Sequence, residues 1–202
     1  MMTTAEQWLQ GARPKTLYAA IAPVLVGTAF AGYNASLLHF LLALSVSLSL
    51  QIGVNYANDY SDGVKGTDND RLGPIRLVAS GLAKPNTVRS AAFLSFALAA
   101  ISGLLLSYRT SWVLIPIGLI SIAAAWGYTA GSKPYGYMGF GEVSVFIFFG
   151  VIATNGTYYV HVEQLSSEVL LASFALGALS CAILVLNNLR DLPKDSQVGK
   201  RT

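Results

Sequence analysis

All six aspartates of this 202-residue chain lie in two short clusters that each follow an apolar run. In the first cluster Asn58 precedes Asp62 by four residues, and in the second Asn187 precedes Asp191 by the same interval. Residues four apart on a helix lie one above the other on the same face. Each cluster therefore predicts a column of oxygen atoms at a helix end. The aspartates are Asp59, Asp62, Asp68 and Asp70 in the first cluster and Asp191 and Asp195 in the second.

Two groups of carboxylates at one membrane face repel each other unless a cation lies between them. Hard divalent cations take oxygen ligands, and Mg²⁺ typically binds one or two carboxylates together with substrate phosphates. The clusters therefore predict Mg²⁺ that bridges the protein to a diphosphate. Helix capping or loop solvation is the alternative explanation, which we favour for Asp70 alone. Basic residues near the clusters predict neutralisation of the remaining phosphate charge: Lys65, Arg71, Arg76, Lys133 and Arg190.

A third polar cluster, residues 128–142, joins two apolar runs. Its tyrosines and glycines also fit an aromatic belt with turns, and Lys133 also fits the excess of basic residues in cytoplasmic loops. Glu142 begins an apolar run and needs a partner there, so we expect it to accept a hydrogen bond or to contact a substrate. Near the N-terminus, Arg13 lies at a helix start and is a candidate phosphate ligand.

Membrane-spanning helices are expected to position these clusters. The chain is 53% hydrophobic and 11% charged, whereas an ordinary globular chain is about 25% charged. Apolar segments of about 20 residues suffice to cross about 30 Å of hydrocarbon. We therefore expect a single all-α domain over residues 1–202, a polytopic helix bundle, which excludes a soluble enzyme, a disordered tail and a disulfide-built secreted domain. The six segments are 17–33, 37–57, 87–107, 111–130, 138–160 and 168–189.

The basic residues predict the orientation of these spans. With a cytoplasmic N-terminus, twelve of the thirteen lysines and arginines lie inside and only Arg109 lies outside, as the positive-inside rule requires. The sequence pI near 9.0 is thus explained without a nucleic-acid partner. The interior connection 58–86 is also long and polar, which is typical of a functional loop. We expect a multi-pass protein of the cell membrane whose active site faces the cytoplasm.

Six motifs of this chain together carry a family resemblance. The motifs are Ala12-Arg13-Pro14-Lys15-Thr16-Leu17, Asn58-Asp59-Tyr60-Ser61-Asp62-Gly63, Gly66-Thr67-Asp68-Asn69-Asp70-Arg71-Leu72-Gly73-Pro74, Lys133-Pro134, Gly136-Tyr137-Met138-Gly139-Phe140-Gly141-Glu142 and Asn187-Asn188-Leu189-Arg190-Asp191. With these motifs the chain resembles the UbiA superfamily of intramembrane aromatic prenyltransferases, over essentially its whole length. Within the superfamily it is most similar to the branch that prenylates 1,4-dihydroxy-2-naphthoate in menaquinone biosynthesis.

The resemblance implies the roles of individual residues. Where many relatives have a third aspartate in the first motif, this chain has Gly66, and Asp68 follows two residues later. Implied Mg²⁺ ligands are Asp59, Asp62, Asp68, Asp191 and Asp195. Implied substrate-binding residues are Arg13, Asn55, Asn58, Arg71, Arg76 and Asn187. Implied catalytic residues are Tyr128, Lys133 and Arg190.

The resemblance also implies the reaction and its competitors. A polyprenyl group would pass from its diphosphate to 1,4-dihydroxy-2-naphthoate with loss of CO₂, giving demethylmenaquinone, within membrane lipid. The acceptor could instead be 4-hydroxybenzoate or homogentisate. Relatives typically have about nine spans, so the chain is expected to lack three of them, and an inactive truncated fragment is a further alternative. A CDP-alcohol phosphotransferase would need its later aspartates about twenty residues on, and an ion transporter would place acids in mid-span.

Overall fold

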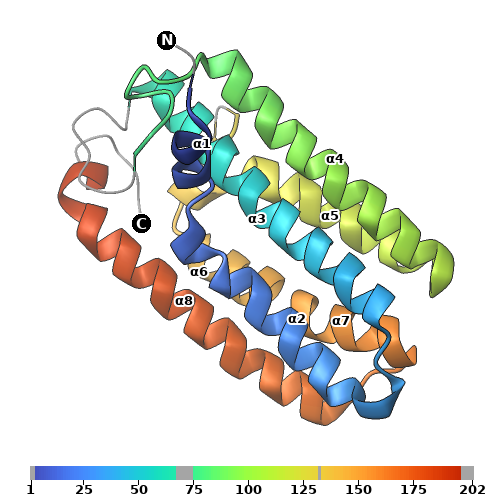
Figure 1. Cartoon of the computed structure of the whole chain (residues 1–202). Helices are drawn as coiled ribbons and strands as arrows, with labels where there is room; N and C mark the ends of the chain where they lie inside the picture. Colours follow the sequence, from blue (N-terminus) through green and yellow to red (C-terminus); the bar gives the residue numbers. More distant parts are fainter. Residues whose placement is uncertain (1–2, 67–74, 132, 197–202) are drawn as a thin grey trace.

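The computed structural model describes residues 3–66, 75–131 and 133–196, with the side chains of 193 and 194 excepted, and all regular elements in these ranges are helical. Four long helical segments and a bent pair form an elongated bundle (Figure 1). The elements are α1 (Ala5–Gly11), η1 (Pro14–Thr16), α2 (Tyr18–Ala31), η2 (Gly32–Asn34), α3 (Leu37–Lys65), α4 (Pro85–Arg109), α5 (Leu114–Gly127), η3 (Tyr135–Tyr137), α6 (Gly141–Val145), η4 (Phe146–Ile152), α7 (Ala153–Val162) and α8 (Ser167–Asp195).

Fewer elements are long enough to cross a membrane than the six that the sequence predicts. Four helical segments in the described residues pass by length and composition, and the bent pair α1–α2 is a fifth if it counts as one span. The four are Leu37–Lys65, Pro85–Arg109, Gly141–Val162 and Ser167–Leu192. The fourth predicted span is the exception, because α5 has only 14 residues and covers about 21 Å at 1.5 Å per residue. The structure thus has four or five elements of spanning length, and a shorter apolar helix, α5, where the fourth span was expected.

The first span bends before α2 and not at the proline within α2. Pro23 lies inside α2 without ending it, whereas the axes of Ala5–Thr16 and Tyr18–Asn34 meet at 56°. Before that bend, within the first segment, Arg13 has a left-handed backbone with φ 55° and ψ 68°. A left-handed residue cannot continue an α-helix, so the chain turns there and restarts at Pro14.

The described aspartates of both clusters lie at one end of the bundle. The C-terminal halves of α3 and α8 reach the end that α1 occupies, and α4 starts there (Figure 1). A buried cluster joins α1, α3 and α4 at this end: Ala12, Tyr56, Ala57, Leu77, Val88, Ala92 and Phe96. A smaller buried cluster holds the other end: Val24, Ala43, Leu106 and Val160. The two clusters fix α3 at both ends and so fix the polar residues along it.

The outer surface of the bundle is apolar, as a lipid-facing surface must be. Large hydrophobic side chains are exposed along α4, α5 and α8, among them Phe93, Leu94, Leu98, Ile101, Leu119, Ile120, Leu171, Leu179, Leu186 and Leu189. Only 22–33% of each span window is buried inside the bundle. This pattern agrees with the membrane assignment.

Glycines allow two helix pairs to approach closely. A Cβ atom on Gly150 of η4 would lie 2.5 Å from the Cα atom of Gly177 in α8, and one on Gly27 of α2 would lie 2.5 Å from the backbone oxygen of Thr154 in α7. By contrast, a Cβ atom on Gly118 of α5 would meet nothing within 4 Å. Small residues are therefore required at two of the helix contacts.

Gly150→Ala should destabilise the protein, because backbone atoms of α8 cannot yield to the added methyl group as a flexible side chain would. Overpacking of this kind typically costs about 1–3 kcal/mol. Gly118→Ala is the matched control and should leave the unfolding temperature unchanged or raise it. Thermal unfolding of the two variants in detergent measures the difference, and equal unfolding temperatures would contradict the η4–α8 contact.

Candidate active site

A cavity of about 1000 Å³ runs through the bundle and receives side chains from every long helix. Its lining is polar at the end that contains the acidic clusters and apolar toward the other end. The polar side chains include Arg13, Asn55, Asn58, Asp62, Arg76, Asn187, Asp191 and Asp195. The apolar lining includes Val24, Ala43, Leu106, Leu114, Phe148 and Val160. Such a cavity suits a molecule with an anionic head and a long hydrocarbon chain.

The first acidic cluster contributes Asn58 and Asp62 to the cavity from one face of α3. Asp62 is 2% exposed, and one of its carboxylate oxygens accepts a short hydrogen bond from the hydroxyl of Tyr137. The side-chain oxygen of Asn58 is buried and has no hydrogen-bond donor among the described residues. A buried oxygen without a donor is costly, so the site is suited to a cation or a donor that binds there.

Asp59 has a different environment from Asp62. Its two carboxylate oxygens accept hydrogen bonds from the backbone N–H groups of Leu77 and Val78, at 2.7 and 2.9 Å, and the residue is not among those that line the cavity. Three residues along a helix rotate a side chain by about 60°, which directs Asp59 toward the segment before α4. Asp59, which the sequence predicts as a metal ligand, is therefore hydrogen-bonded to the backbone of the segment before α4.

The second acidic cluster lies across the cavity on α8. Asp191 and Asp195 are both buried and line the cavity with Asn187. Arg190 donates two hydrogen bonds to Asp191, from Nε to Oδ1 at 3.0 Å and from Nη2 to Oδ2 at 2.9 Å. One turn earlier, Asn188 donates to the carboxylate of Glu142 at 3.1 Å, which ties α8 to α6 and provides the partner that Glu142 was expected to need.

The basic residues that were predicted near the clusters divide into two groups. Arg76 and Arg190 line the cavity, as does the candidate Arg13, and Arg76 is buried. Lys65 instead donates to the backbone oxygen of Thr129 at 3.1 Å and lies 5.0 Å from the ring centre of Tyr137.

Three further residues were predicted to belong to the site: Lys133, Arg71 and Asp68. Lys133 is exposed and is not among the residues that line the cavity, so the described geometry does not place its ammonium group beside the acidic residues. Arg71 and Asp68, like Asp70, lie outside the described residues.

Tyr128 lines the cavity where α5 ends. Its ring contacts that of Tyr135 edge-on, with centroids 5.5 Å apart. Tyr128 therefore presents its phenol group to the cavity.

Sequence reasoning missed two participants in the site. Tyr137, which was not among the predicted site residues, contacts Asp62 from a segment 75 residues away, and no local pattern indicates that pairing. Gln51 lines the cavity from the middle of α3 and donates to the hydroxyl oxygen of Thr16 at 3.1 Å. A lone amide in an apolar span is a signal that could have identified Gln51.

Comparison with known proteins finds similarity over the whole chain. The model of the UbiA prenyltransferase family matches residues 20–202. A 1,4-dihydroxy-2-naphthoate octaprenyltransferase of Mycobacterium tuberculosis is 53% identical, and the match covers 100% of this chain and 70% of that protein. The enzyme of the same name from Escherichia coli is 39% identical, with 100% of this chain and 68% of the relative covered. The UbiA prenyltransferase domain-containing protein 1 of Xenopus tropicalis is 30% identical, with 93% and 55% covered.

Proposed function

The chain belongs to the UbiA prenyltransferase family, and we propose that it transfers a polyprenyl group from polyprenyl diphosphate to 1,4-dihydroxy-2-naphthoate. The carboxylate of the acceptor leaves as CO₂ and demethylmenaquinone forms, initially in its reduced quinol state. The observation that carries the proposal is the pair of oxygen-rich helix faces, on α3 and α8, at the polar end of a cavity that is otherwise apolar. The names of the relatives support the choice of acceptor.

The residues at the polar end fit Mg²⁺. Asn58 and Asp62 on α3 and Asp191 and Asp195 on α8 line the cavity and offer the oxygen ligands that this ion prefers, and the Asn58 oxygen is buried without a donor among the described residues. Among those residues no three of His, Cys, Asp or Glu gather closely enough to hold an ion by themselves. We therefore propose two partial sites that the substrate diphosphate completes. We leave Asp59 out of this set.

The cavity residues act on the donor substrate by binding charge and excluding water. Arg13 and Arg76 would bind the diphosphate oxygens. Mg²⁺, when bound, supplies Lewis-acid stabilisation of the negative charge on the departing diphosphate. As the allylic C–O bond breaks, its electron pair leaves with the diphosphate. The apolar part of the cavity encloses the hydrocarbon and protects the allylic cation from water.

The acceptor ring then supplies the electrons for the new bond. Ring electrons attack the allylic carbon, and a C–C bond forms at the ring carbon that carries the carboxylate. Loss of CO₂ leaves its bonding electrons in the ring and restores aromaticity. A ring held beside the allylic carbon needs no further activation, so positioning is the contribution that the protein makes to this step.

The test is a transfer assay with the protein in lipid vesicles, one labelled polyprenyl diphosphate and a panel of aromatic acceptors. We expect prenylation of 1,4-dihydroxy-2-naphthoate, loss of turnover in EDTA and recovery with Mg²⁺. A preference for 4-hydroxybenzoate or homogentisate would contradict the proposed acceptor, and turnover unaffected by EDTA would contradict the metal. Absence of turnover with every acceptor, from protein inserted in the vesicles, would support the alternative of an inactive chain.

We further propose that the polar end faces the cytoplasm, since twelve of the thirteen basic residues lie on that side of the expected topology. A cysteine introduced beside Lys84, at the start of α4, should be protected from an impermeant thiol reagent added outside cells. One introduced beside Asn34, in η2 at the other end, should react. Labelling beside Lys84 from outside would reverse the orientation.

A further inference from the structure

Two amide side chains, Gln51 and Asn55, lie one turn apart on α3 and line the cavity. They are 8% and 3% exposed, so both have been withdrawn almost fully from water. Buried amides normally have partners for their oxygen as well as for their NH₂ group. The partners of these two amides therefore indicate what binds in this part of the cavity.

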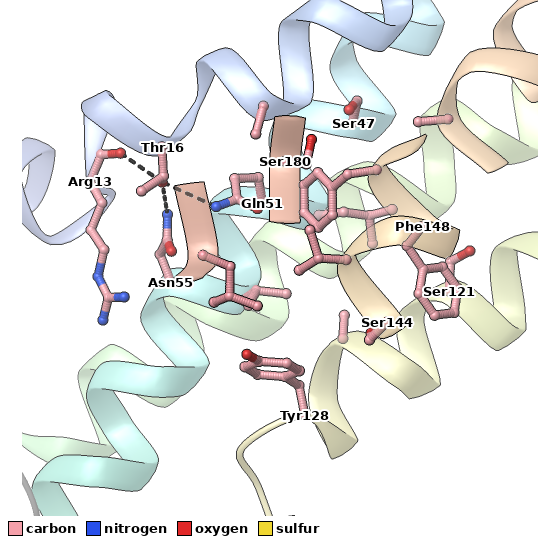
Figure 2. A pocket seen from close by; sticks show the side chains of 18 of the residues that line it. Arg13, Thr16, Ser47, Gln51, Asn55, Ser121, Tyr128, Ser144, Phe148 and Ser180 are labelled. Carbon is pink, nitrogen blue, oxygen red and sulfur yellow. Dashed lines mark hydrogen bonds between the residues drawn. The ribbon is translucent and has the colours of Figure 1, made fainter. Parts of the chain in front are cut away.

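Thr16 determines which way both amides point. Its hydroxyl donates to the backbone oxygen of Arg13 at 2.9 Å, so its oxygen can only accept from the amides. It accepts from Nε2 of Gln51 at 3.1 Å and from Nδ2 of Asn55 at 3.2 Å, and Figure 2 shows both bonds beside the cavity. Asn55 also donates to the backbone oxygen of Ala12 at 2.8 Å, which uses both of its N–H groups.

The two amide oxygens are thereby turned away from Thr16. No described residue donates a hydrogen bond to Oε1 of Gln51 or Oδ1 of Asn55. Reversing either amide would place an oxygen against the Thr16 hydroxyl oxygen, whose own proton is already bonded to Arg13. The orientation therefore follows from hydrogen-bond chemistry, and it leaves two acceptors for a ligand that carries donors.

We infer that Gln51 and Asn55 bind the ring hydroxyl groups of the aromatic acceptor and select for a ring with two of them; this inference rests on the proposed function. Of the groups that the two substrates carry, a metal-bound diphosphate presents only acceptor oxygens and a prenyl chain presents no polar group. The hydroxyl groups of the acceptor are the remaining donors. The rise of about 6 Å over the four residues from Gln51 to Asn55 is also close to the distance between hydroxyl groups at opposite ends of one ring.

The position of the amides along α3 agrees with this role. Asn55 precedes Asn58 by three residues and Asp62 by seven, which places it about 4.5 and 10.5 Å along the helix axis from the proposed Mg²⁺ ligands. Gln51 lies about 16 Å from Asp62 by the same measure, which is too far for one metal-bound diphosphate to reach both. The ring would thus lie next to the diphosphate, on the side of the apolar cavity.

The experiment compares acceptors that differ by one donor. 1,4-Dihydroxy-2-naphthoate and its 4-methyl ether are assayed with the wild-type protein and with Gln51→Met, which keeps the length of the side chain and removes its polar atoms. One lost hydrogen bond of this kind corresponds to a change of about tenfold in affinity. We expect the wild type to prefer the dihydroxy acceptor about tenfold in kcat/KM and in equilibrium binding, and Gln51→Met to lose that preference with an unchanged KM for the prenyl diphosphate.

Asn55→Leu is a second variant, and Ser45→Ala is the matched control on the same helix, because Ser45 bonds to Ser102 on α4 and does not line the cavity. Asn55→Leu also removes the bond to Ala12, so its unfolding temperature is measured alongside. A wild-type protein that prenylates both acceptors equally well would overturn the inference without any variant, and so would full preference in Gln51→Met. Failure of the wild type to use any dihydroxynaphthoate would instead overturn the proposed function.

Discussion

Asp62→Asn should lower prenyl transfer by roughly 10²–10³-fold and leave the unfolding temperature close to that of the wild type. The substitution removes the negative charge that the proposed Mg²⁺ needs, yet the amide oxygen can still accept the hydrogen bond that Tyr137 donates to this position. Asp191→Asn on α8 should have an effect of the same size, because both helix faces are required to complete one site. The two substitutions should therefore lower activity without lowering stability.

Measurement of kcat/KM over a range of Mg²⁺ concentrations checks this expectation. The variants should need more Mg²⁺ than the wild type for whatever activity remains. Glu163→Gln, an exposed acid beyond the end of α7, is the matched control and should behave like the wild type. Near-normal turnover of Asp62→Asn or Asp191→Asn at ordinary Mg²⁺ concentrations would refute the two-helix site.

Asp59→Ala should have its largest effect on stability. The carboxylate accepts from two backbone N–H groups, those of Leu77 and Val78, and each buried donor left without an acceptor costs about 1–3 kcal/mol. The free energy of unfolding should therefore fall by about 2–6 kcal/mol. Because Arg76 adjoins Leu77 and lines the cavity, the KM for the prenyl diphosphate should also rise.

Denaturant or thermal unfolding in detergent measures the loss of stability. Asp59→Asn is an intermediate variant, because its side chain keeps one of the two acceptor oxygens. The three proteins should rank with the wild type most stable, Asp59→Asn next and Asp59→Ala least. An Asp59→Ala variant that unfolds like the wild type but has no activity would show that Asp59 is a metal ligand, as the sequence motif suggests.

The comparison of Asp59 with Asp62 shows how far the sequence could predict this site. The spacing of Asn58 and Asp62, and of Asn187 and Asp191, is a local property of one helix each, and the structure brings all four to one cavity. The environment of Asp59 depends on a segment 18 residues away. Such non-local contacts are invisible to helical periodicity, so the pattern could not distinguish a carboxylate in the cavity from one that holds the chain.

The same distinction applies to the fold. Hydrophobic length identified α3, α4 and α8 and the continuous run from α6 to α7, because a long apolar run is sufficient evidence for a span. At α5 the apolar run is longer than the helix that forms within it, so length alone overestimates the extent of that helix. Hydrophobic length also gives no sign of the 56° bend between Thr16 and Tyr18 in the first span.

Arg13 has opposite requirements for folding and for chemistry. A residue other than glycine with a φ of 55° carries a local strain of about 1–3 kcal/mol, and glycine would relieve it. Glycine would also delete the guanidinium group from the lining of the cavity. Selection for thermal stability alone should therefore favour glycine at position 13, whereas selection for turnover should retain arginine. Directed evolution of this protein thus meets a trade-off between stability and activity at Arg13.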